Sequence, residues 1–234
     1  MRTLDRMTKV LAVAVVVIGI VAGTVHAADA EVVAIPTVFC HNEKNNYTGY
    51  ITDMITGTGM NGNGQDYTGS WPTNMPSSWT ATTSAYQAEW QSGALLDSGV
   101  SINSKIGWAI FDLGSVYTLD TFYIWNVREN SGRYTKTFNV YVAEAPTAAP
   151  THGPTSGGDD YDFSSGGTGW TLINTGAPLN GTFRGDQTVD ISGNSGRYVA
   201  VEILFNNGDG SRVGLAEVGI TIIPPPEGTV VLIR

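Results

Sequence analysis

The chain has 234 residues, with 12 basic and 21 acidic side chains, 14% charged residues and 29 glycines. Its negative net charge argues against nucleic acid and anionic lipid as partners, because the phosphate attraction that dominates such binding has the wrong sign. The single cysteine, Cys40, excludes an intrachain disulfide, so stability has to come from the core. We expect Cys40 to be a small hydrophobic residue buried at the end of a strand.

The first 27 residues are typical of a secretory signal peptide. Three basic residues precede an apolar run over 10–25, and Val25 and Ala27 stand before the expected cleavage site, with Ala30 as the alternative. A membrane-spanning helix is the rival interpretation, but glycines interrupt the run and about 20 apolar residues are needed to span a bilayer. Cleavage leaves nine basic and twenty acidic side chains. The remaining length suits one large β domain.

Short runs of β-branched and aromatic residues, separated by Gly, Asn, Asp, Ser and Pro, predict an all-β domain over residues 31–223. The pattern predicts eight strands, at Glu31–Cys40, Gly107–Asp112, Thr118–Val127, Thr137–Ala143, Gly169–Asn174, Gln187–Ile191, Tyr198–Phe205 and Gly214–Ile223. About eight antiparallel strands fit a jelly-roll β-sandwich. No long window has the 3.6-residue period of a helix, so helix is expected only as a turn or two within 50–95.

Two long polar segments interrupt these strands. The first, over 42–93, contains three tryptophans and four tyrosines among glycines and asparagines, and its aromatic content predicts that it is ordered and packed. The second, over 145–167, is rich in Pro, Gly, Ser and Asp and has almost no apolar anchor. We expect this second segment to be a mobile excursion.

The C-terminal tail over 224–234 is rich in proline. It is similar to the beginning of a bacterial PEP-CTERM sorting signal, although Pro-Pro-Pro-Glu replaces the usual order and only four apolar residues precede Arg234. Such a tail cannot cross a membrane, and the alternative is a stiff Pro-rich exit from the last strand. We therefore expect a secreted or cell-surface protein that meets the membrane only through an uncleaved signal peptide or a sorting tail.

Two blocks of sequence carry a family resemblance. The first reads Trp-x-x-Phe-Asp-Leu-Gly from Trp108, then Tyr-x-Leu-Asp-x-Phe-x-Ile-Trp-Asn from Tyr117 and Phe-x-Val-Tyr-Val-Ala from Phe138. The second reads Gly-Leu-Ala-Glu-Val-x-Ile from Gly214. Together they resemble the coagulation-factor type C, or discoidin-like, galactose-binding domain, over roughly residues 33–223. The resemblance implies a β-sandwich that binds a ligand, most often a sugar.

In that family a loop after the Ile-Trp-Asn strand faces the ligand, and here this loop contains Arg128, Glu129, Asn130 and Arg133. Arg133 is the residue most expected to contact a sugar hydroxyl or carboxylate, and Arg128 and Asn130 accompany it. The alternative is a solvated turn in which Arg128 pairs with Glu129. The Asn- and Gly-rich run over 206–212 also offers oxygens, but indicates a hairpin turn first.

Sugar recognition also needs an aromatic face for the apolar side of a pyranose. Trp71, Trp79 and Tyr86 lie in the first long segment and are the candidate stacking residues. The other tryptophans, Trp90, Trp108 and Trp125, occupy strand positions and are expected in the core.

The resemblance also implies a structural calcium ion. It would be held by Glu217 of the closing strand together with Asp53, with Asn61 as a further oxygen donor, because hard cations take carboxylate, amide and carbonyl oxygens in loops. The family's usual Asp-Gly-Asn-x-x-Thr run is not present in that form. The alternative for Glu217 is a strand-end carboxylate that accepts backbone hydrogen bonds.

No motif of nucleophilic or metal-dependent catalysis stands out. The chain has no Gly-x-Ser-x-Gly, no His-Glu-x-x-His and no Cys/His cluster, so we do not expect an enzyme, although a pair of carboxylates for glycoside hydrolysis leaves no sequence signature. The leading hypothesis is a non-catalytic exported module that recognises extracellular or cell-surface carbohydrate. The alternative is a structural or matrix protein of a bacterial envelope without a sugar pocket.

Overall fold

The structure is a computed structural model, and it describes residues 29–41, 51–55, 60–62, 65–66, 80–81, 89–92, 105–127, 130–151, 161–164, 169–178 and 187–225. The expected signal peptide and most of the Pro-rich tail lie outside these ranges. In the ranges that are described, no helix is long and apolar enough to cross a membrane.

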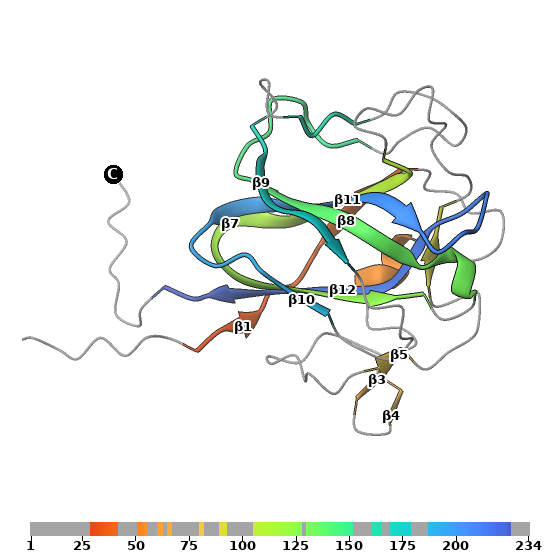
Figure 1. Cartoon of the computed structure of the whole chain (residues 1–234). Coiled ribbons are helices and arrows are strands. Elements are labelled where there is room, and N and C mark those ends of the chain that lie inside the picture. The colour runs from red at the N-terminus through yellow and green to blue at the C-terminus, as the bar shows by residue number, and fades with distance from the viewer. Residues whose placement is uncertain are drawn as a thin grey trace, which may run out of the picture.

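One long bent strand organises the fold. Strand β7 runs over Gly107–Asn126, and Figure 1 shows it curving from one layer of the molecule into the other. Its first half pairs on one side with β2 (Thr37–Cys40) and on the other with β11 (Ser195–Asn206). Beyond β11 lie β8 (Thr135–Ala143) and the edge strand β9 (Thr171–Pro178). These five segments form the first layer.

The second half of β7 belongs to the second layer. It pairs with β10 (Gln187–Asp190) on one side and with β12 (Gly214–Ile223) on the other. The far edge of β12 pairs with β1 (Glu31–Val32) and β6 (Trp90–Gln91). All of these pairings are antiparallel, so the single hydrogen-bonded sheet folds over itself into a sandwich.

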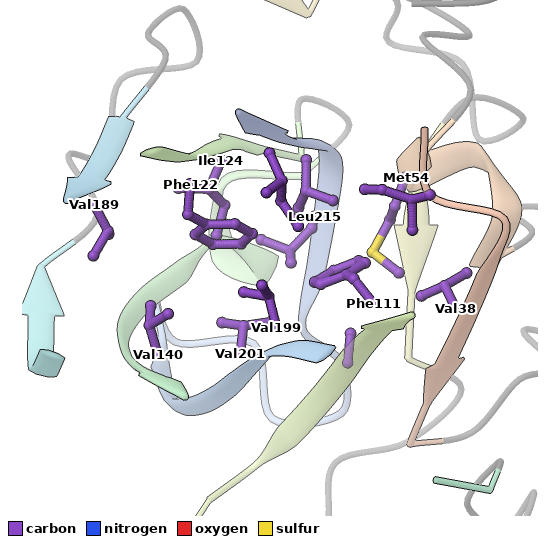
Figure 2. Close-up of a cluster of buried hydrophobic side chains, with 14 of the residues drawn as sticks. Val38, Met54, Phe111, Phe122, Ile124, Val140, Val189, Val199, Val201 and Leu215 are labelled. Carbon is purple, nitrogen blue, oxygen red and sulfur yellow. The ribbon is translucent and has the colours of Figure 1, made fainter. Parts of the chain in front are cut away.

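The main core fills the space between the two layers. Alternate residues of each strand point inward, such as Val199, Val201 and Ile203 on β11, and all three are fully buried. Figure 2 shows side chains from both layers meeting, with Phe111 and Phe122 from the two halves of β7. Their ring centroids lie 6.0 Å apart. Cys40 is a free, fully buried cysteine at the end of β2, as predicted.

Two shorter pieces complete the described fold. The 3-10 helix η1 (Ile51–Ile55) packs against β12, β2 and β6 and buries Met54 in the main core. A separate three-stranded sheet consists of β3 (Met60–Gly62), β4 (Gln65–Asp66) and β5 (Thr80–Ala81). These pieces lie within the first long segment, whose aromatic residues other than Trp90 fall outside the described residues.

The predicted all-β jelly roll is confirmed, with three corrections. The two strands expected at 107–112 and 118–127 are one strand, because the chain bends at Gly114 (φ +78°) without leaving the sheet. The strand expected at 31–40 is two, β1 and β2, which pair with different layers. A second 3-10 turn, η3 (Ser131–Arg133), lies outside the range in which helix was expected.

The prediction that 145–167 lacks an apolar anchor is also wrong. Tyr161 and Phe163 are buried, with Phe163 fully so, against Trp108, Tyr141 and Trp170. These residues, with Ile110, Ala143 and Ala200, form a second buried cluster, which we call the outer-face cluster. It lies on the side of the first layer that faces away from the main core, because Ala200 alternates with the core residues Val199 and Val201.

Gly214 provides a test of the close packing where β12 begins. A Cβ atom there would lie 2.4 Å from the carbonyl oxygen of Trp90 and 2.7 Å from Val127 Cγ1. We expect Gly214→Ala to lower the free energy of unfolding by about 1–3 kcal/mol in urea denaturation. Gly210→Ala is the matched control, because a Cβ atom added at Gly210 would have nothing within 4 Å. An equal effect of both substitutions would show that the contact with Trp90 is not limiting.

Candidate functional site

The described part of the predicted ligand loop, residues 130–133, forms the 3-10 turn η3 directly before β8. Asn130 caps η3, and its Oδ1 accepts a 2.8 Å hydrogen bond from the Gly132 amide, while the Arg133 amide donates to the Asn130 carbonyl at 3.1 Å. The chain then enters β8, where the Asn126 side chain exchanges two 2.9 Å hydrogen bonds with the Thr135 backbone. Asn126, the last residue of β7, therefore holds the start of β8 in place.

A second loop, the 206–212 connection between β11 and β12, docks onto this turn. The Asn207 amide donates to the Tyr134 carbonyl and the Asp209 amide to the Gly132 carbonyl, both at 3.0 Å. The Asn207 side chain donates to the Ser131 carbonyl at 3.0 Å. A Cβ on Gly132 would lie 3.3 Å from the Asp209 nitrogen, so glycine permits this approach. The hairpin turn predicted for this run is wrong, because β11 and β12 do not pair with each other: each pairs with a different half of β7, so the run connects the two layers.

Arg133 joins the two loops to the second layer. Its Nε donates to Asp209 Oδ2 at 3.0 Å, and its Nη1 donates to Gln91 Oε1 at 2.7 Å. The side chains of Arg133 and Asp209 are 15% and 14% exposed. We call the residues of these two loops together with Gln91 the loop-end site.

Asp209 is the most heavily bonded carboxylate of the loop-end site. Its Oδ1 accepts from the Ser211 amide and hydroxyl, both at 2.8 Å, and from the Arg212 amide at 3.0 Å. Burial alone would raise the pKa of Asp209, but the hydrogen bonds from Ser211, Arg133 and Arg212 outweigh it and hold the pKa below its usual value. The site therefore keeps a charged acid and a charged guanidinium side by side.

Phe205 is an exposed aromatic residue next to the 206–212 loop in the chain, and the sequence analysis did not single it out. It ends the regular part of β11 directly before the 206–212 loop and is 61% exposed. Its position in an apolar strand predicted a strand residue. The signal that would have found it is the aromatic residue immediately before an Asn- and Gly-rich turn.

The structure describes only some of the predicted ligand residues. Arg133 and Asn130 lie together in the loop-end site, whereas Arg128, Trp71, Trp79 and Tyr86 fall outside the described residues. The three tryptophans expected in the core are buried: Trp90, Trp108 and Trp125.

The predicted calcium ligands come from three different elements. Glu217 is a fully buried carboxylate on β12, and Asp53 lies in η1, which packs against that strand. Asn61 lies on β3 of the small sheet. Within the described ranges no group of three or more His, Cys, Asp or Glu side chains could hold a metal ion. Any such site therefore needs amide or carbonyl oxygens in addition to the two acids.

A second polar group, which the sequence analysis missed, lies within the outer-face cluster. Glu202 and Lys105 are fully buried, with Lys105 Nζ 3.4 Å from Glu202 Oε1. Glu202 Oε2 accepts from Asn139 Nδ2 at 2.7 Å and from the Tyr141 hydroxyl at 2.8 Å. Burial first, and Glu202 second, raise the pKa of Tyr141, so its hydroxyl remains a donor.

Solved structures of other proteins share this architecture at low sequence identity. A fucolectin from striped bass (Morone saxatilis) serum has a TM-score of 0.52 and 13% identity, over 86% of this chain and 52% of that chain. Truncated AlyQ, with CBM32 and alginate lyase domains, has a TM-score of 0.50 and 13% identity, over 87% of this chain and 36% of that chain. The chain thus spans about half and about a third of these two chains.

No protein-family model matches the sequence, and no curated protein sequence matches it significantly. The structural likeness shows the fold, which is the jelly-roll β-sandwich of galactose-binding-like domains. The fold that the two sequence blocks implied is therefore confirmed.

Proposed function

We propose that the protein is a non-catalytic module that binds extracellular or cell-surface carbohydrate at its loop-end site. The observation that carries the proposal is the meeting of a guanidinium, a carboxylate and amide side chains in the loop-end site, with the exposed Phe205 directly before the 206–212 loop in the chain. Aromatic faces receive the apolar side of a pyranose, and charged and amide groups bind its hydroxyls. The fold shared with a fucolectin and with a chain that contains a CBM32 domain supports this class of ligand.

Some residues of the loop-end site hold its two loops together, and others are exposed and available to a sugar. Asn130, Asp209 and Arg133 fix the two loops, since each bonds within the site. Ser131, Asn207 and Ser211 are exposed on the same two loops, although the Asn207 side chain also donates to the Ser131 carbonyl and the Ser211 hydroxyl to Asp209. A sugar would stack on Phe205 and bond to this polar rim.

A glycan array screened with residues 28–234, followed by calorimetry on any hit, tests the proposal. Phe205→Ala should weaken binding about fivefold to tenfold, because one aromatic stacking contact contributes on the order of 1 kcal/mol. Val116→Ala is the matched control, because Val116 is also a surface hydrophobic residue, 50% exposed, but lies on the bend of β7. Equal binding by the wild type and Phe205→Ala would exclude Phe205 as the platform.

Arg133→Ala tests whether sugar binding depends on the hydrogen bonds that join the two loops. It should abolish binding and also loosen the loop-end site, whereas Arg133→Lys should keep the charge but lose one of the two hydrogen bonds. Hydrogen exchange at the Asp209 and Arg212 amides reports the loosening. Full binding by Arg133→Ala would place the sugar elsewhere.

A structural or matrix protein of a bacterial envelope is the second candidate. The observation that favours it is the engagement of Arg133 with Asp209 and Gln91 and its low exposure, which suit a structural ion pair. In either case we propose export through the signal peptide at 1–27, to the medium or the cell surface, with 224–234 as a sorting tail. A folded protein that is silent on the array and fractionates with the envelope would support this candidate.

We also propose a structural calcium ion held by Glu217 and Asp53, with Asn61 as a further oxygen donor. The support is the chemistry of the donors: Glu217 is a buried carboxylate on β12, and η1, which carries Asp53, packs against that strand. Chelation should lower the melting temperature by several degrees, and Glu217→Ala should remove that difference. An unchanged melting temperature with chelator would exclude the ion.

A further inference from the structure

The outer-face cluster contains a buried side chain, Phe163, that comes from a connecting segment and not from a strand. Trp108, Tyr141 and Trp170 come from or adjoin strands β7, β8 and β9, and they form three aromatic walls. Phe163 comes from a short segment, 161–164, between the first layer's β8 and β9, and is fully buried among these walls. We call residues 161–164 the strap.

Phe163 occupies the cluster in the manner of a bound ring. Its ring is stacked on Tyr141, with centroids 5.2 Å apart and an interplanar angle of 20°. Trp170 and Trp108 meet it edge-on at 5.3 and 6.2 Å, and Lys105 Nζ lies 5.4 Å from its centroid. A pyranose ring is about the size of a phenyl ring, and it stacks on an aromatic face with its mean plane parallel to that face.

The walls around Phe163 are more polar than a phenyl ring requires. Glu202 is the cross-strand neighbour of both Trp108 and Asn139, so these three side chains form a row across β7, β11 and β8. Lys105 and the Tyr141 hydroxyl bond to Glu202 in the same row. Such a row offers a carboxylate, an amide, a hydroxyl and an ammonium group within one buried patch.

The strap leaves part of this polarity unsatisfied. Trp108 Nε1 is buried and has no hydrogen-bond partner in the described part of the chain, although Phe163 and Tyr161 both contact the indole ring. On the same face of β8, two residues from Asn139, Thr137 Oγ1 is likewise buried without a partner among the described residues. A buried donor without a partner costs free energy. A ligand that carries hydroxyl groups would complement this patch better than an apolar ring does.

We propose that the outer-face cluster is a second carbohydrate site, for a single pyranose residue, which the strap occupies in cis through Phe163. The site is distinct from the loop-end site, since it lies on the face of the first layer and uses none of the same residues. Displacement of Phe163 lets the sugar stack on Tyr141 and accept a hydrogen bond from Trp108 Nε1. The strap is held by bonds that can open, namely the Tyr161 hydroxyl to the Ala148 carbonyl at 2.6 Å and Trp170 Nε1 to the Tyr161 hydroxyl at 3.2 Å.

The test removes the occupant and offers free sugars. Residues 28–234 with Phe163→Ala are titrated with D-glucose, D-galactose, D-mannose and N-acetyl-D-glucosamine by calorimetry and by NMR of the indole N–H signals. We expect at least one sugar to bind this variant at least tenfold more tightly than the wild type and to shift the Trp108 signal. Adding Trp108→Phe, which removes the indole N–H, or Tyr141→Leu, which removes the stacking face, should weaken that binding at least tenfold. Arg133→Ala should leave it unchanged, which separates this site from the loop-end site.

Three outcomes would overturn the proposal. One is a folded Phe163→Ala protein that binds no sugar, and another is sugar binding that Trp108→Phe and Tyr141→Leu leave intact. The third is binding of phenol or indole without any sugar, which would make the patch an apolar cage. If Phe163→Ala does not fold, amide hydrogen exchange of the wild-type strap is measured instead. At about 100 mM, at least one of the four sugars should speed exchange at 161–164. Unchanged exchange with all four sugars would refute the site.

Discussion

Replacing Glu202 with alanine is expected to lower the free energy of unfolding by about 3–5 kcal/mol. Glu202 and Lys105 are both fully buried, and the substitution leaves the ammonium group of Lys105 in the interior without this carboxylate. It also removes the acceptor of the Asn139 amide and of the Tyr141 hydroxyl. Each of these three groups has lost its hydration on folding, so the loss of Glu202 as a shared partner lowers the free energy of unfolding through all three.

Urea denaturation at neutral pH measures this loss. The matched control is Arg197→Ala, which removes an ion pair of shorter contacts, 2.8 Å each to Asp112 Oδ1 and Oδ2, at a place where the Arg197 side chain is 40% exposed. Its effect should be clearly smaller, since water solvates the remaining charge. Equal losses from the two substitutions would show that burial does not set the cost of breaking these pairs.

A double substitution separates the cost of an isolated charge from the value of the pair. Lys105→Met with Glu202→Leu should recover much of the stability lost by Glu202→Ala, because apolar side chains of similar size need no partner in the interior. Asn139 and Tyr141 would still lose their acceptor, so recovery should be incomplete. No recovery at all would mean that the loss arises from packing rather than from the buried charge of Lys105.

The sequence predicted those features that depend on local pattern. Strand β12 begins and ends where the pattern placed it, at Gly214 and Ile223, because its apolar run is bounded by turn residues on one side and by prolines on the other. The bend of β7 was read as a strand end, because glycine usually ends an apolar run. Here Gly114 turns the strand while Asp112 Oδ1 accepts its amide hydrogen at 2.8 Å, so pairing resumes beyond it.

Features that depend on distant pairing were not accessible from the sequence. Arg133 was predicted as a ligand residue, but its contact with Asp209 lies 76 residues away and arises from how two loops dock. The Lys105–Glu202 pair spans 97 residues and needs the register of β11 against β7 to be known. In the same way Tyr161 and Phe163 looked like isolated aromatics in a polar run, and only the face of the first layer gives them a place to bury.

His41 is expected to make the protein less stable in mild acid. It follows β2, is 3% exposed, and burial first, with the nearby charge of Lys105 second, lowers its pKa from 6.5 to about 4. Between these two pH values the unfolded chain binds a proton at His41 and the folded chain does not. Stability from this group is therefore fully present above about pH 6.5 and is lost as the pH falls toward 4, by roughly 2–3 kcal/mol between pH 7.5 and pH 4.5.

Comparing His41→Phe with the wild type isolates this contribution. Phenylalanine has no titratable group, so the difference in unfolding free energy between pH 7.5 and pH 4.5 should shrink by roughly 2–3 kcal/mol. Any cost of the substitution in packing applies equally at both pH values. The described acids with lowered pKa values, Asp112, Asp162, Asp190 and Asp209, titrate below their ordinary value of 3.8, so any stability they contribute is lost mainly at still lower pH. His41→Gln guards against an effect of ring size. If both variants kept the full wild-type pH dependence, His41 would have to be protonated in the folded state, and its burial beside Lys105 would need another charge to compensate it.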